Sequence, residues 1–150
     1  MIKATINLKT GKGSGLEDLA KRLEKMEDAS VKVGLPSGKE DASVIEYAIY
    51  NHEGTEHIPA RPFITIAMHE NEDVIMDGLK SIAKAALHGE QDLKTGLGKI
   101  GAFAAGKIQE TIAGSLPPPN DPKTIKQKGS STTLIDTGRL RQSITWEYKE

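Results

Sequence analysis

The sequence predicts an α+β fold, in which a small one-sided sheet, mixed or antiparallel, packs against two long helices, with a short helix and long surface loops. Apolar and polar residues alternate in residues 2–8, 31–35 and 144–148, as in strands with one buried face. Helical spacing of apolar residues separates these segments. A chain of 150 residues suits one domain, so we expect residues 1–150 to enclose a single core.

Apolar residues recur every three or four positions in four segments, which predicts four helices. The second helix should end near Gly54, and Gly89 suits the end of the third, which we expect to be the longest. Glycines in the fourth lower its intrinsic stability but permit close packing against a neighbour. Residues 117–133 are rich in proline and then polar, which favours a long surface loop. The predicted helices cover residues 16–26, 44–54, 65–88 and 97–112.

The composition argues against several classes of function. Twenty Lys and Arg against 21 Asp and Glu give a net charge of -1, so the basic surface of a dedicated nucleic-acid binder is missing. The chain has no cysteine, which removes disulfides and thiolate chemistry and suits a reducing cytoplasm. No apolar run approaches the ~18 residues of a membrane span, and the amino terminus lacks the pattern of a secretory signal. We therefore expect a soluble protein.

Motifs that could carry chemistry are incomplete. Residues 11–15, Gly-Lys-Gly-Ser-Gly, fit neither a dinucleotide fingerprint nor a P-loop in their spacing. His52, Glu53 and His57 suggest a zinc-protease helix, but Glu56 stands where the second histidine should be. No Gly-x-Ser-x-Gly elbow is present to activate a serine. We therefore predict no catalytic residue, no metal site and no cofactor.

Two groups of charged residues have ordinary explanations. Glu70 and Asp73 are spaced to share a helix face, where such carboxylates are usually solvated. Lys123, Lys126 and Lys128 form a small basic patch that could touch phosphate, although scattered lysines on a solvated loop are commoner. Neither group predicts an activity.

Two longer stretches carry a resemblance to a known family. Residues 48–63 contain Tyr-Asn-His-Glu-Gly-Thr and then Ile-Pro-Ala-Arg-Pro-Phe, and residues 122–144 contain a Lys-rich stretch before Leu-Ile-Asp-Thr-Gly-Arg-Leu-Arg-Gln-Ser-Ile. We call them the first and second signature segments. Together with Val-Lys-Val-Gly-Leu-Pro at residues 31–36, they resemble the phage tail completion or head-tail joining proteins, also described as neck or minor tail proteins. The resemblance covers most of the chain in order.

The resemblance implies a structural virion protein and no enzyme. It implies a subunit of a ring, expected to be a hexamer, at the head-tail junction, where it contacts head-connector and tail-terminator or tail-tube proteins. Such a protein is made in the host cytoplasm, can be monomeric before it assembles in the virion, and meets DNA only in the ring lumen. The residues expected at the assembly interfaces are Tyr50, Glu53, Gly54, Thr55, Ile58, Pro59, Arg61, Pro62, Phe63, Asp136, Thr137, Gly138 and Leu140.

The physical properties of these residues suggest how each could shape or anchor the two signature segments. Pro59 and Pro62 favour an extended path, and Arg61 can hold a carboxylate or a carbonyl with two nitrogens. Phe63 can anchor the segment in the core or in a neighbouring subunit. Asp136 is expected to cap a short helix from which Leu140 and Ile144 turn inward. The two loops are therefore candidate patches for a head-to-tail interface.

Two other classes of function stay open at this point. One is a small DNA-binding or regulatory protein of a mobile element that uses the lysines at residues 123–128, which salt-dependent DNA binding would favour. The other is a metal-dependent hydrolase built on His52, Glu53 and His57, which a metal assay after purification without chelator would test.

Overall fold

The computed structural model describes residues 14–36, 38, 41–129, 131–134 and 138–150. Within this part of the chain, the helices and one two-stranded antiparallel sheet confirm the α+β prediction. The predicted strand at residues 2–8 lies outside the described residues. No helix of the described ranges is long and apolar enough to cross a membrane. The elements are α1 (Ser14–Asp28), β1 (Ser30–Gly34), α2 (Ala42–Glu53), α3 (Phe63–Glu70), α4 (Glu72–His88), α5 (Leu93–Ala113), α6 (Pro122–Lys128), α7 (Arg139–Ser143) and β2 (Thr145–Lys149).

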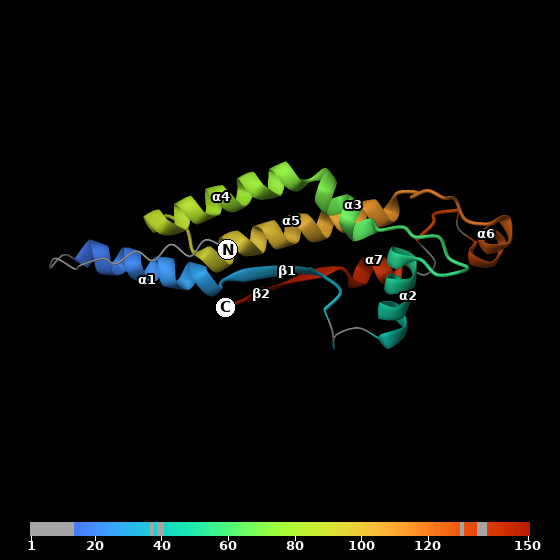
Figure 1. Ribbon diagram of the computed structural model, residues 1–150, viewed down its shortest axis with the longest axis horizontal. Coiled ribbons are helices and arrows are strands. Elements are labelled where there is room, and N and C mark those ends of the chain that lie inside the picture. Colours follow the sequence, from blue (N-terminus) through green and yellow to red (C-terminus); the bar gives the residue numbers. More distant parts are fainter. Residues whose placement is uncertain (1–13, 37, 39–40, 130, 135–137) are drawn as a thin grey trace.

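Helix α5 runs along the long axis of the molecule, and both strands, α3, α4 and α7 pack against it (Figure 1). The sheet packs on one side of α5, and α3 and α4 pack on another. Helix α1 lies at one end of the molecule, whereas α2, α6 and α7 gather at the opposite end (Figure 1). The sheet therefore contacts one of the two long helices directly, and the second long helix packs on the first.

The sheet presents one apolar face to α5, as the alternation of its residues predicts. Val33 pairs with Trp146 and Val31 pairs with Tyr148 in the antiparallel register. Two glycines of α5, Gly98 and Gly101, lie directly against the sheet: a Cβ added at Gly101 would stand 2.7 Å from Val31 Cγ2 and 2.9 Å from the Trp146 ring. Gly98 and Gly101 thus permit the close approach that the sequence suggested, whereas Gly106 does not contribute to it.

Alanine substitutions at two glycines of α5 should have opposite effects on stability. Gly101→Ala should lower the free energy of unfolding by about 1–3 kcal/mol, because the new methyl group overlaps Val31 and Trp146. Gly106 lies in the same helix with nothing within 4 Å of an added Cβ, so Gly106→Ala should raise that free energy by about 0.5–1 kcal/mol. Urea unfolding followed by circular dichroism measures both. Equal effects of the two substitutions would contradict this packing.

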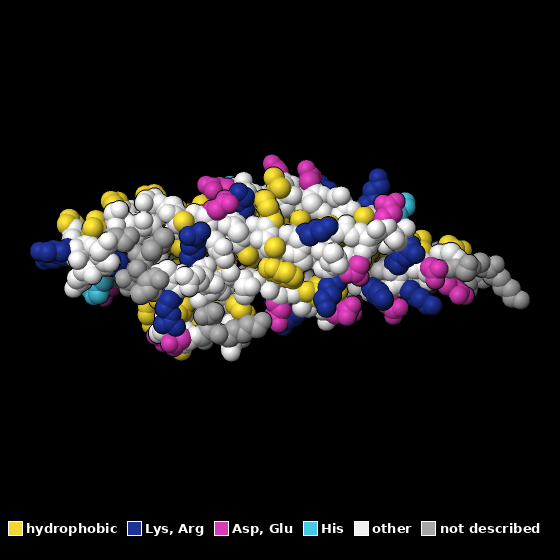
Figure 2. Space-filling model, turned by 180° about the vertical axis from the view of Figure 1, so that it is seen from behind, with side chains coloured by type: hydrophobic (Ala, Val, Ile, Leu, Met, Phe, Trp, Pro, Cys, Tyr) yellow, Lys and Arg dark blue, Asp and Glu magenta, His cyan; other side chains and the backbone are white. Residues whose placement is uncertain are grey.

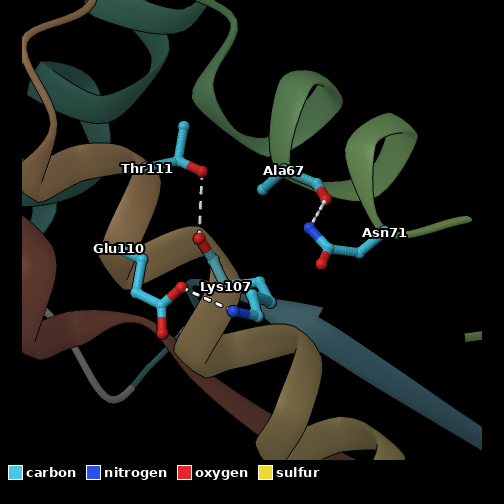
Figure 3. Close-up of polar contacts among 5 residues, drawn as sticks. All are labelled: Ala67, Asn71, Lys107, Glu110 and Thr111. Carbon is cyan, nitrogen blue, oxygen red and sulfur yellow. Dashed lines mark hydrogen bonds and ion pairs between the residues drawn. The ribbon is translucent and has the colours of Figure 1, made fainter. Parts of the chain in front are cut away.

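The single long helix predicted at residues 65–88 is wrong, because two helices meet at Asn71. The Asn71 side chain donates from Nδ2 to the carbonyl of Ala67 at 2.8 Å and so replaces a helical hydrogen bond (Figure 3). Acidic Glu72 and Asp73 then occupy the first turn of α4, where the helix dipole favours them. Consequently α5, with 21 residues, is the longest described helix.

The ends of two helices agree with the prediction. Helix α2 ends at Gly54, whose φ is 80°, and α4 ends at Gly89, whose φ is 74° and whose N–H donates to the carbonyls of Ala85 and Ala86. Both positive φ values lie in the region that glycine tolerates best.

The amino end of α5 depends on an aspartate, which makes stability sensitive to acid. Asp92 accepts hydrogen bonds from Thr95 N at 2.9 Å and Thr95 Oγ1 at 3.0 Å, and these bonds lower the pKa of Asp92 below its usual 3.8. A carboxyl with a lower pKa in the folded state stabilises the fold above its unfolded pKa, and this contribution is lost as the pH falls through the folded pKa. The difference in Tm between wild type and Asp92→Asn should therefore shrink from about pH 6 to about pH 3. A difference that stays constant over this range, measured by thermal unfolding, would contradict the capping role.

The loop predicted at residues 117–133 contains a helix, so that prediction is wrong in part. Asp121 caps α6 by accepting from Lys123 N at 2.8 Å, Pro122 stands in the first turn, and Gly129 ends the helix with a φ of 68°. Proline is favoured at the start of a helix because its missing N–H would have no helical partner there. The Asp-Pro start and the glycine end are sequence signals for this helix.

The main core lies where α2, α3 and α7 meet the carboxyl-terminal half of α5. Its side chains are mostly aliphatic, as the scarcity of aromatic residues predicts. Phe63, Ile108 and Ile112 are fully buried in it. The cluster consists of Ala48, Phe63, Ala67, Ala105, Ile108, Ile112, Leu134, Leu140 and Ile144.

Candidate functional site

The structure divides the predicted site residues by their exposure. Arg61, Phe63 and Leu140 are buried, and Asp136 and Thr137 lie outside the described residues. The half-buried residues of the set are Gly54, Ile58, Pro62 and Gly138. The exposed residues of the set are Tyr50, Glu53, Thr55 and Pro59. The first signature segment therefore supplies both core anchors and surface residues.

The turn after α2 is compact. Thr55 N donates to Ile58 O at 2.7 Å, and Thr55 Oγ1 accepts from Ile58 N at 3.0 Å. A Cβ added at Gly54 would stand 2.8 Å from the backbone N of Ala60, in addition to the strain of a positive φ. Glycine is thus required here by both the backbone conformation and the space.

Arg61 fastens the first signature segment to the proline-rich segment 57 residues later. Its Nε and Nη2 donate to Pro118 O at 3.1 and 2.7 Å, and Nη2 lies 3.4 Å from Asn120 Oδ1. Its backbone N donates to Asn51 O at 2.7 Å. These bonds confirm the expectation that Arg61 holds a carbonyl with two nitrogens. We call this contact of residues 58–63 with residues 118–120 the junction.

Phe63 follows Arg61 and enters the core, which confirms its role as an anchor. It is completely buried and meets the His52 ring edge-on, with ring centroids 5.3 Å apart. His52 Nδ1 lies 2.8 Å from Glu53 Oε1, and His52 Nε2 lies 3.5 Å from Thr65 Oγ1. Glu53 therefore holds the histidine that packs on Phe63.

The second signature segment reaches the same core from the other side. Leu134, Leu140 and Ile144 are at most 3% exposed, so the predicted inward turn of Leu140 and Ile144 is confirmed. Helix α7 begins after Gly138, whose φ is 77°, and no side chain of the described residues caps it by a hydrogen bond. The expected capping residue Asp136 lies outside the described residues. The positive φ of Gly138, which glycine tolerates best, turns the chain into α7.

A cavity of about 480 Å³ lies beside the junction. We call it the junction cavity. It brings residues of the first signature segment together with residues before and within α6. Its lining residues are Tyr47, Asn51, His57, Ile58, Pro59, Arg61, Pro119, Asn120, Asp121, Thr124, Lys128 and Thr133.

The charged groups at the cavity are chiefly cations. Burial lowers the pKa of Arg61 from its usual value, and the charge of Tyr47 partly opposes this shift. Lys128 Nζ donates to Tyr47 Oη at 3.2 Å and lies 5.6 Å from the centre of that ring. Lys123 and Lys126, by contrast, are exposed on α6 and do not line the cavity. The three lysines do not act as one basic patch.

The other sequence motifs are not assembled into a catalytic arrangement in the described ranges. His52 contacts Glu53 and Thr65, whereas His57 is exposed after the turn. No cluster of three or more His, Cys, Asp or Glu side chains suited to a metal occurs among the residues that the structure describes. Glu70 and Asp73 stand on opposite sides of the helix break at Asn71.

Several large apolar side chains are exposed, and of those on α2 and α4 the sequence predicted Tyr50 at an interface. Ile49 and Tyr50 on α2 are 52% and 47% exposed, and Val74 and Met76 on α4 are 58% and 47% exposed. Hydrophobic side chains also reach the surface in the middle of the face in Figure 2, with charged side chains around them. Exposed apolar side chains indicate a surface that binds other proteins where they lie together as one patch.

Functional residues that the sequence did not reveal are the partners of Arg61. Pro118 and Asn120 act through a carbonyl and an amide, and Asn51 is buried beside them. Asn51 lies within the first signature segment, directly after Tyr50, and this position is the feature of the sequence that could have identified it. Pro118 carries no such signal because any residue has a carbonyl.

Comparison with known proteins adds no family to these observations. No protein-family model, curated protein or solved structure matches the chain. A function for this chain must therefore be argued from its own residues and their geometry.

Proposed function

We propose that this chain is a structural virion protein of a tailed bacteriophage or prophage, a ring-forming subunit at the head-tail junction needed for tail completion. The observation that carries the proposal is the meeting of the two signature segments at one end of the fold. Arg61 binds Pro118 just before the second segment, and Phe63 shares a core with Leu134 and Leu140. The family-like residues thus form one structural unit rather than scattered matches.

The exposed residues of that unit support a role in assembly. Tyr50, the first residue of the Tyr-x-x-Glu pattern, and its neighbour Ile49 expose about half of their surface on α2. Burial of such apolar surface against another subunit is favourable by about 25 cal/mol per Å². The patch formed by Ile49 and Tyr50, here called the α2 patch, is therefore a suitable contact surface.

A second exposed pair suits a head-to-tail contact. Val74 and Met76 lie on α4, on a different element from the α2 patch. A ring requires that one surface of each subunit meet a different surface of the next, and α4 offers exposed apolar side chains on an element other than α2. The neighbours along the particle axis would be head-connector and tail-terminator or tail-tube proteins.

The experiment that tests assembly is native mass spectrometry over a concentration series, with negative-stain images of the same samples and of samples mixed with purified tail tubes. We expect a ring, of six subunits by resemblance, either alone or on the tubes. The double variant Ile49→Ser with Tyr50→Ser should stay monomeric and folded. Glu46→Ala, a change of an exposed residue on the same helix, should assemble like wild type.

Two results would contradict the proposal. A monomer at every concentration with no ring on tail tubes would exclude self-assembly on the tail. Salt-dependent binding to DNA by such a monomer would favour a small DNA-binding or regulatory protein instead.

A further inference from the structure

Arg61 is a buried cation without an acidic partner in the described part of the chain. It is only 4% exposed, and its side chain bonds to the Pro118 carbonyl and the Asn120 amide oxygen, both neutral. No described carboxylate forms an ion pair with it. Taking an unpaired charge out of water is costly, and a protein usually compensates with an opposite charge.

The described partners of this guanidinium use two of its three nitrogens. A guanidinium has five N–H donors, and the bonds to Pro118 and Asn120 use Nε and Nη2. Nη1 has no protein acceptor among the described residues, yet no buried side-chain nitrogen or oxygen there lacks a partner. Arg61 lines the junction cavity, so a ligand in that cavity would lie next to its guanidinium.

The other charged groups of the cavity add to a positive potential. Lys128 lines the cavity, and among the described residues its ammonium donates to the neutral Tyr47 hydroxyl. His57 lines it as well. Asp121 is the one carboxylate among the described lining residues, and its Oδ1 accepts from Lys123 N at the start of α6. The two permanent cations, Arg61 and Lys128, thus outnumber it.

We propose that the junction cavity binds an oxyanion, a carboxylate or a phosphate group. Arg61 Nη1 donates charge-assisted hydrogen bonds to the oxyanion, and Lys128 adds a second positive charge from α6. The cavity of about 480 Å³ has room for such a group. This site is independent of ring assembly, because it follows from the cavity and its charges and not from the exposed apolar patches.

The test uses the full-length protein and two probes, sodium phosphate and sodium acetate, each titrated at constant ionic strength made up with chloride. The Arg61 Nε–H signal in ¹H–¹⁵N spectra reports on the guanidinium directly. We expect a saturable shift of this signal with a dissociation constant of about 1 mM for at least one probe, the affinity of a few charge-assisted hydrogen bonds. Tighter binding of acetate would identify a carboxylate, as on an acidic side chain of a partner, and tighter binding of phosphate would identify free phosphate.

A matched pair of variants locates the site. Lys128→Gln removes the cavity ammonium and should weaken binding about tenfold, whereas Lys126→Gln changes an exposed lysine of the same helix outside the cavity and should leave it unchanged. Circular dichroism checks that both variants fold. The proposal is overturned if neither probe shifts the Arg61 signal to saturation, or if the two variants weaken binding equally.

Discussion

Replacing Phe63 with alanine should lower the free energy of unfolding by about 3–5 kcal/mol. Phe63 is completely buried at the start of α3, where it packs in the main core and against the His52 ring. Its removal leaves a cavity that the surrounding helices can close only in part. Chemical unfolding in urea, followed by circular dichroism, gives the change directly.

Phe103→Ala is the matched control for this prediction. Phe103 is half-buried on α5, and its ring lies 5.7 Å from Lys107 Nζ, so alanine there removes less buried surface. We expect a clearly smaller loss of stability. If Phe63→Ala cost no more than Phe103→Ala, the first signature segment would not be anchored in the core as the structure has it.

Leu140→Ala should lower the free energy of unfolding by about 2–4 kcal/mol. Leu140 is 3% exposed on α7, and it brings the second signature segment into the core cluster that contains Phe63. Because α7 has five residues, too few to be stable as an isolated helix, packing rather than helix propensity holds it in place. Loss of Leu140 should therefore loosen α7 as well as the core, and hydrogen exchange of its amides measures this second effect.

Leu16→Ala is the control for Leu140, since it makes the same chemical change at a residue that is 42% exposed on α1. Its effect should stay within about 0.5 kcal/mol, as for most surface substitutions. If Leu16→Ala and Leu140→Ala lowered the free energy of unfolding by similar amounts, the buried position of Leu140 would be wrong.

Much of the fold could be predicted because it depends on local patterns. The stripes of apolar residues predicted the helices, and Gly54 and Gly89 marked two helix ends correctly. The break at Asn71 was missed because the stripe continues on both sides of it, although the polar run from His69 to Asp73 signals it. Helix α6 was missed because the prolines before it were taken to exclude helix, whereas Pro122 stands at its start.

Only part of the candidate site could be predicted from the sequence, namely Arg61 and Phe63 but not the partners of Arg61. The chemistry of Arg61 and the size and apolarity of Phe63 are visible in the sequence, so their roles as clip and anchor were expected. The partners of Arg61 could not be predicted, because Pro118 is brought to it by tertiary packing across 57 residues. The exposure of Tyr50 also depends on which face of α2 meets the core, and the weak apolar periodicity of this helix does not decide that.

Whether purified phage particles contain this chain tests the proposed function most directly. Particles of the phage or prophage that encodes this chain would be isolated, analysed by peptide mass spectrometry and labelled with an antibody for electron microscopy. We predict that the chain is present in tailed particles, with label at the head-tail junction, and that its deletion yields separate heads and tails. Tailed particles that lack the chain, while the same lysate contains it, would contradict a role as a structural virion protein.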